Sequence, residues 1–327
     1  MKPSKFHTAY NPILFTFEDD TLTYEVLTVN IAGSEIELKR EYINGVATFD
    51  VSGVIKNYFA DKLLDSINDT DSDIFKEPAL YVNYSVGGNN YYAINAVTQI
   101  GTSLDYGLLK DKALTTLETL RIYDGYPFDI SILCDMPLEI TQGTLYANAI
   151  NRVKIDSEDE INSIAEYLTT LGGDNILTLG GDNIVVGGFS IGQAEENCTP
   201  RNPFYVRWIN YKGGVDYWMF GVQQTRNTTL QENQTYQRYI TDYLNENGTD
   251  YSYYKRATKA ITVGAEHLTL ADFNALELMT LSPYIEVYEN GKWIRIIIES
   301  STTSRQTSDD RNSFECTFLL PELNLQY

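Results

Sequence analysis

The sequence predicts a mainly β protein, built of antiparallel β-sandwich or barrel-like domains with a few short helices. Three observations lead to this prediction. The chain of 327 residues contains 25 tyrosines and 13 phenylalanines, and aromatic residues favour strands. Apolar and polar residues alternate in many short segments, as they do in strands with one buried face. Glycine-rich or Asn-Gly turns separate several of these segments.

Residues 1–104 are predicted to form an N-terminal β domain. Tight turns are expected at Asn44-Gly45 and at Gly87-Gly88, because these residues tolerate the backbone of a hairpin turn. Asp50 precedes a short segment that places Ile55 and Phe59 on one side, so we expect it to cap a helix. The expected strands are 12–17, 22–31, 36–40, 46–50, 80–86 and 91–97.

A leucine-rich connector is expected over 105–125, followed by a second β-rich domain over 126–327. The clearest helix signal in the second domain lies at 158–171, where Ser157 and Glu160 form a capping box. Thr269 and Asp272 are expected to cap a further helix. Expected hairpins are 204–210 with 215–222, and 284–288 with 292–299, and a polar loop is expected over 300–312.

The segment at about 223–258 differs from the rest, because it is polar, poor in glycine and rich in Gln, Asn, Thr and Tyr. It has too few aliphatic residues for a core of its own, so we expect a projecting arm or long hairpin. The sequence leaves open whether this arm is an assembly interface or a surface loop that lies on its own domain. The candidate interface residues are Tyr236, Tyr239, Tyr243, Tyr251, Tyr253 and Tyr254.

Acidic residues outnumber basic ones by 45 to 24, which gives a formal net charge of −21. Such a surface repels nucleic-acid phosphates and anionic lipids, so we expect neither nucleic-acid readout nor a membrane partner. An acidic surface could also line a channel through which DNA passes without sticking. The N-terminal residues lack the apolar core of a signal peptide, and no apolar run approaches the ~20 residues of a membrane helix.

Residues for catalysis or metal binding are scarce. The only histidines are His7 and His267, and the three cysteines, Cys134, Cys198 and Cys316, are far apart in the sequence. We therefore expect no catalytic residue, no metal and no cofactor, with buried thiols. The acidic run around Asp69, Asp71 and Asp73 resembles half of a calcium loop but has Ile74 where glycine is needed, so a solvated loop is expected.

Two other function classes remain open from the residues. Trp208 and Trp218 could stack on sugars in a carbohydrate-binding or cell-surface β-module. Strand periodicity places Trp208 on one face with Phe204 and Val206, which favours core packing. A glycosidase would need two of the acidic residues to face one cleft.

The hairpin formed by 202–210 and 213–220 resembles segments of tail-associated proteins from phages and prophages of gut Bacteroidota. Further similar segments are 10–13, 38–50, 291–293 and 318–322. The resemblance implies a distal-tail or baseplate type of protein, whose β domains form a ring around the tail axis. It implies no cofactor and supplies no catalytic residues.

We therefore expect a non-enzymatic structural subunit of a phage tail or baseplate. It would be synthesised in the cytoplasm of the bacterial host and located in the virion tail. Its expected partners are other copies of itself and other virion tail proteins, bound through protein–protein contacts. The alternative is a carbohydrate-binding or cell-surface β-module, and a glycosidase is the lesser alternative.

Overall fold

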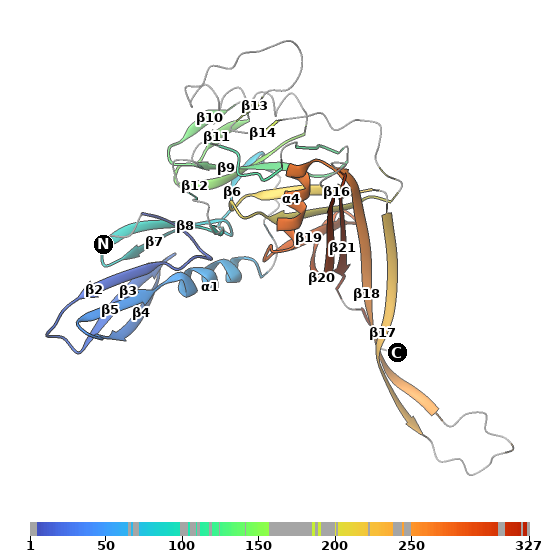
Figure 1. Cartoon of the computed structure of the whole chain (residues 1–327), viewed down its shortest axis with the longest axis horizontal. Helices are drawn as coiled ribbons and strands as arrows, with labels where there is room; N and C mark the ends of the chain where they lie inside the picture. Colours follow the sequence, from blue (N-terminus) through green and yellow to red (C-terminus); the bar gives the residue numbers. More distant parts are fainter. Residues whose placement is uncertain are drawn as a thin grey trace. The chain divides into compact units, whose positions relative to one another are not determined.

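A computed structural model shows a mainly β protein with antiparallel sheets and, among the residues it describes, two helices, which confirms the predicted fold class (Figure 1). The described residues are 5–64, 67, 72–98, 104, 109, 112–117, 120–123, 125–140, 142–156, 185–186, 189–190, 200, 202–221, 223–237, 244, 250–306, 311–321 and 323–325.

The chain forms two compact units. Unit 1 comprises Met1–Thr199, Arg207–Trp218 and Leu281–Tyr284. Unit 2 comprises Pro200–Val206, Met219–Thr280 and Ile285–Tyr327. The predicted division, with a domain over 1–104, a connector over 105–125 and a domain over 126–327, stays a prediction.

Residues 112–117, which lie within the expected connector, are built into unit 1 by long-range hydrogen bonds. The Asn210 side-chain amide donates to the Leu114 carbonyl oxygen at 2.8 Å, and the Lys212 ammonium donates to the Thr115 carbonyl oxygen at 2.7 Å. The Thr115 hydroxyl donates to the carboxylate of Asp216 at 2.7 Å. Because these bonds join segments about a hundred residues apart, sequence composition around 105–125 did not reveal them.

Unit 1 begins with a five-stranded sheet in the order β1-β8-β7-β3-β4. All neighbours in it are antiparallel except β1 and β8, which are parallel. An antiparallel pair of strands, β2 with β5, shares one apolar core with this sheet, as in a sandwich. The strands are β1 (Phe6–Thr8), β2 (Leu14–Glu18), β3 (Tyr24–Ile31), β4 (Ser34–Glu41), β5 (Val46–Asp50), β7 (Tyr81–Val86) and β8 (Asn89–Ile94).

Helix α1 (Ser52–Lys62) closes this core, as predicted. The N-cap residue of α1 is Val51 and not the predicted Asp50. The Asp50 carboxylate accepts hydrogen bonds from the backbone N–H of Ser52 at 2.9 Å and of Ile13 at 3.1 Å, so it still joins the helix start to the residue that precedes β2. The side chains of Ile55 and Phe59, on the core-facing side of the helix, are fully buried. The predicted turn also forms, with Asn44 and Gly45 at φ of 52° and 75°.

The remaining described strands of unit 1 form small antiparallel sheets. The central one has the order β6-β12-β9, and β12 pairs with β9 on one side and β6 on the other. The predicted helix at 158–171 lies outside the described residues. The strands are β6 (Ile74–Lys76), β9 (Asp129–Cys134), β10 (Leu138–Ile140), β11 (Gly143–Leu145), β12 (Ala149–Lys154), β13 (Val185–Val186) and β14 (Phe189–Ser190).

Unit 2 is built on a sheet with the strand order β16-β15-β19-β20-β21-β18-β17, and β22 pairs with β18. The first three residues of β15 and the last two of β16 belong to this unit. The strands are β15 (Phe204–Ile209), β16 (Val215–Phe220), β17 (Gln223–Gln237), β18 (Asp250–Leu268), β19 (Ile285–Glu289), β20 (Lys292–Gln306), β21 (Arg311–Leu319) and β22 (Leu323–Leu325).

Helix α4 (Leu270–Met279) begins where the sequence predicts it, because the Thr269 hydroxyl accepts the N–H of Asp272 at 3.1 Å. The aromatic core of unit 2 includes Phe204 and Phe318, whose ring centroids lie 5.4 Å apart. No helix in the described part of the chain is long and apolar enough to cross a membrane.

The prediction of a polar loop over 300–312 was wrong. Strand β20 continues to Gln306 and β21 begins at Arg311, and their ladder pairs Ser301 with Cys316 and Thr303 with Phe314. A run of serines and threonines can stay extended when its backbone is paired with a strand that carries the buried side chains, here Phe314 and Cys316.

Candidate functional site

The segment expected to be an arm contains a long antiparallel hairpin, formed by β17 and β18. The ladder runs from Gln223 opposite Gly264 to Gln237 opposite Asp250. On its other side, β18 pairs with β21 and then with β22, and the last of these pairs is at Lys255. Beyond Lys255, the two strands pair only with each other among the described strands, and their ribbons extend past the rest of the sheet (Figure 1).

The ladder brings part of the predicted tyrosine set together at the end of the hairpin. Tyr236 pairs directly with Tyr251, and Tyr254 pairs with Gln234. Tyr253 lies at a register shift between these pairs, where β18 has one residue more than β17. Tyr239 and Tyr243 lie outside the described residues. Four of the six candidate positions therefore share one short stretch of hairpin backbone.

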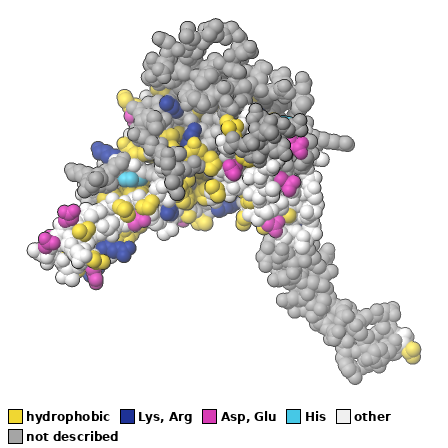
Figure 2. Space-filling view, viewed as in Figure 1, with side chains coloured by type: hydrophobic (Ala, Val, Ile, Leu, Met, Phe, Trp, Pro, Cys, Tyr) yellow, Lys and Arg dark blue, Asp and Glu magenta, His cyan; other side chains and the backbone are white. Residues whose placement is uncertain are grey.

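Nearer the sheet, β17 is the last strand in the strand order. The five side chains from Thr225 to Thr229 are all exposed. Since neighbouring residues of a strand point to opposite faces, neither face of β17 is covered here. Figure 2 shows this part of unit 2 mostly in white, with few charged side chains. An exposed strand edge of low charge is a template for pairing with another chain.

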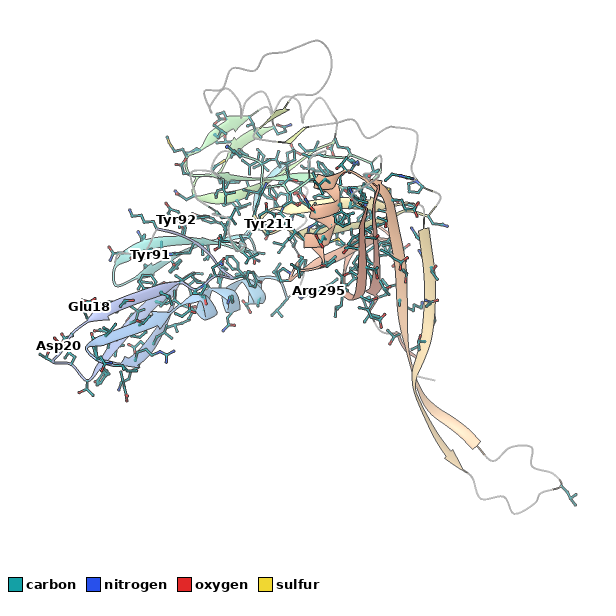
Figure 3. All side chains as sticks on the ribbon, viewed as in Figure 1. Glu18, Asp20, Tyr91, Tyr92, Tyr211 and Arg295 are labelled. Carbon is teal, nitrogen blue, oxygen red and sulfur yellow. The ribbon has the colours of Figure 1, made fainter. Side chains whose placement is uncertain are left out.

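Many tyrosines in the described part of the chain pack inside the protein and not on its surface. Tyr91 and Tyr92 of β8 (Figure 3) point to opposite faces, and Tyr91 packs against Tyr84 with ring centroids 5.6 Å apart. Tyrosine content alone therefore overstates the interface. The buried tyrosines are Tyr81, Tyr84, Tyr91, Tyr205, Tyr217 and Tyr284.

A buried ionic network in unit 1 was not found from the sequence. Arg152 on β12 donates through Nε and Nη2 to the two carboxylate oxygens of Asp129 on β9, at 3.0 and 2.5 Å. Its Nη1 donates to Glu77 at 3.2 Å, and the Tyr217 hydroxyl donates to Asp129. All four residues are buried. The available signal was one acidic residue, Asp129, in the apolar segment 129–134 and two basic residues, Arg152 and Lys154, in the apolar segment 149–155.

The electrostatics of this network are those of a structural element. Burial is the largest single influence on the pKa of Arg152 and lowers it, but the charges of Asp129, Tyr217 and Glu77 and the hydrogen bond to Asp129 together outweigh burial and hold the pKa well above its ordinary value. Burial raises the pKa of Glu77, and the positive charge of Arg152 opposes that rise. Because one buried guanidinium already binds both carboxylates, they do not form the open acid pair of a glycosidase.

His7 lies in an aromatic cluster on β1. Its Nδ1 is 2.6 Å from the Tyr84 hydroxyl, and its ring centroid is 5.8 Å from that of Tyr91. Burial lowers the pKa of His7 to about 4, so the ring is neutral at pH 7. The part of the chain that the structure describes contains no group of three His, Cys, Asp or Glu side chains that could hold a metal ion.

The structure describes two of the three cysteines and only part of the calcium-like loop. Cys134 and Cys316 are buried, as expected, whereas Cys198 lies outside the described residues. Asp69 and Asp71 lie outside them too.

The two tryptophans considered for sugar stacking are buried. Trp208 is 1% exposed and Trp218 is 7% exposed. The guanidinium carbon of Arg121 lies 4.6 Å from the Trp218 ring centroid and covers that ring. The predicted core packing of Trp208 is confirmed, and neither indole is an exposed platform.

Comparison with known proteins adds no relative: no protein-family model matches the chain, and no curated protein has a detectably similar sequence.

Proposed function

We propose that this chain is a non-enzymatic structural subunit of a phage tail or baseplate, which assembles through protein–protein contacts into a ring or similar homo-oligomer. Its partners are other copies of the chain and other tail proteins, and its location is the virion tail. The single observation that carries the proposal is the β17–β18 hairpin, whose end pairs with no other described strand.

A hairpin of this kind has a physical reason to find a partner. An isolated two-stranded hairpin is marginally stable in water, because it lacks a covered face. Tyrosine side chains bury about 150–250 Å² each when they enter an interface, and their hydroxyl groups keep hydrogen-bond partners. Four tyrosines in the strands of the hairpin end, Tyr236, Tyr251, Tyr253 and Tyr254, therefore favour a surface that becomes buried on assembly.

The first test removes the end of the hairpin and keeps the sheet. Residues 234–254 are replaced by Asn-Gly, a two-residue turn that joins Asn233 to its ladder partner Lys255. The pairing of β18 with β21 and β22 is retained. All six candidate tyrosines are lost. We expect a folded monomer with unchanged circular dichroism in the remaining strands, where the intact chain forms larger particles in sedimentation or light scattering.

A second variant separates the tyrosines from the backbone of the hairpin. All six are replaced by threonine, which retains strand propensity. The matched control replaces the exposed Tyr10 and Tyr146, which lie outside the hairpin, by threonine. We expect the hairpin variant to lose assembly and the control to keep it. An unchanged particle mass after deletion of 234–254, or an intact chain that neither self-associates nor joins tail proteins, would contradict the proposed function.

A further inference from the structure

Two strands of this chain lie at the end of a sheet, and each has one edge that pairs with no described strand. The unshifted part of the ladder has the same length in both. The first is β17, whose pairing with β18 has no register shift from Gln223 to Leu230. The second is β4, which pairs with β3 without a shift from Ser34 to Glu41. Each of these runs is eight residues long, and each strand is the last in its order and pairs with a single described neighbour.

We propose that the open edge of β17 in one copy pairs with the open edge of β4 in the next copy, which joins the two sheets head to tail. This inference rests on the proposed function, since it names how neighbouring copies meet. A contact between two different surfaces repeats from copy to copy and generates a ring or a filament. It uses the strand edges near the sheets and not the tyrosine end of the hairpin.

The charges of the two strands favour β4 of the next copy as the strand that pairs with β17. The run 223–230 has one charged residue, Arg226, in a chain with a net charge of −21. β4 has three exposed acidic residues, Glu35, Glu37 and Glu41, against two exposed basic residues, Lys39 and Arg40, and the acidic ones include Glu37 at its centre. Two strongly acidic copies repel one another at most positions, so a contact that places a positive residue against these carboxylates is favoured. Pairing of β17 with a second β17 would instead place like charges near one another.

The pleat of the strands sets which side chains meet. Side chains directly opposite one another across a ladder lie on the same face. With Arg226 opposite Glu37, the side chains of Ile36 and Leu38 remain on the core side of β4, where they are half-buried. Side chains with polar groups then face water on the other side of the joined sheets. The geometry therefore assigns Arg226 and Glu37 as the central pair of the contact.

A charge swap tests this pair. Arg226→Glu and Glu37→Arg are each expected to weaken self-association roughly 3- to 30-fold, because like charges then lie opposite one another. The double variant restores association, since the pair is again complementary and the net charge equals that of the original chain. Lys292→Glu, at an exposed position on β20, controls for the change in net charge. Failure of the double variant to recover would overturn the inference.

Disulfide trapping identifies the partner strand directly. Arg226→Cys and Glu37→Cys are made in separate chains with Cys198 replaced by serine, and Cys134 and Cys316 are buried. Directly opposite residues of a ladder lie close enough for a disulfide. We expect cross-linked dimers only when the two variants are mixed. Cross-linking of Arg226→Cys alone would show pairing of β17 with itself and overturn the inference, as would the absence of any cross-link.

The outcomes distinguish this inference from the proposed function. If deletion of 234–254 abolishes assembly and the charge swap has no effect, the edge pairing is wrong and the tail-subunit proposal stands. If the swap and the mixed cross-link behave as expected while the deletion has no effect, copies pair through their strand edges, but the proposed function, which is carried by the end of the hairpin, is contradicted. If none of the variants affects assembly, both proposals fail.

Discussion

Removal of the Arg152 guanidinium tests most directly how much the buried ionic network contributes to the free energy of unfolding. Arg152→Met keeps most of the side-chain volume and leaves two buried carboxylates, Asp129 and Glu77, without their shared cation. The wild-type network has a bidentate bond to Asp129, at 3.0 and 2.5 Å, and a single bond to Glu77 at 3.2 Å. With one partner of a buried pair removed, the other charge remains in a medium that solvates it poorly.

Loss of one member of a buried ion pair costs about 3–5 kcal/mol of unfolding free energy. Lys154 on the same strand provides the control, because its ammonium lies 3.7 Å from Asp156 and the two side chains are 41% and 69% exposed. An exposed pair of this kind contributes about 0–1 kcal/mol. Lys154→Met should therefore lower the unfolding free energy by at most ~1 kcal/mol.

Urea unfolding at pH 7 and pH 5 measures both variants. Two of the three tryptophans, Trp208 and Trp218, lie in unit 1, so their fluorescence reports mainly on that unit. In Arg152→Met the charge that opposes the raised pKa of Glu77 is lost, so this pKa rises further, and protonation at lower pH removes the buried charge. The difference in unfolding free energy between wild type and variant should therefore shrink from pH 7 to pH 5.

Two outcomes would refute this reasoning. A loss no larger than that of the Lys154→Met control would show that the network contributes little. A loss that grows as the pH falls would show that the destabilisation does not come from buried unpaired carboxylates.

Two further predictions concern unit 1. A Cβ added at Gly214 would lie 1.9 Å from the Leu114 carbonyl oxygen, so Gly214→Ala should destabilise the protein by about 1–3 kcal/mol. In the control Gly53→Ala in α1, nothing lies within 4 Å of the added Cβ, and this variant should be stabilised by about 0.5–1 kcal/mol. Equal effects of the two substitutions in thermal unfolding would contradict the clash at Gly214. In the folded protein the pKa of His7 is lowered from 6.5 to about 4. As the pH falls, the unfolded chain therefore binds a proton at His7 before the folded protein does. Stability should therefore fall between pH 6.5 and 4, by about 1–2 kcal/mol after allowance for the partial exposure of the ring. His7→Gln should remove that component, and an unchanged pH profile would contradict it.

Local features of the fold were predictable because neighbouring residues decide them. Asn44-Gly45 and Asn290-Gly291 take the left-handed backbone that a hairpin turn needs, with φ of 52° and 75°, and 53° and 77°. Asp50 and Thr269 accept backbone N–H groups two and three residues ahead. Such signals act within a few residues, so sequence spacing is enough to find them.

The candidate site was predictable only in outline. A polar segment without a core of its own indicated a long hairpin, and the pairing of β17 with β18 fits that indication. The open edges of β17 and β4 could not be predicted, because an edge is defined by which strand lies beside it, and strand order depends on pairings distant in sequence. Pairings of that kind depend on packing in the whole sheet.

The sequence by itself determined a mainly β chain, its turns and two helix starts, since periodicity and capping are local properties of the chain. Only the tertiary structure decided that residues 112–117 belong inside unit 1, held by Asn210 and Lys212. It alone also decided that Arg152 meets Asp129 and Glu77 in the interior. The physical reason is that a buried polar group must find its partner wherever the folded chain places one, at any separation along the sequence.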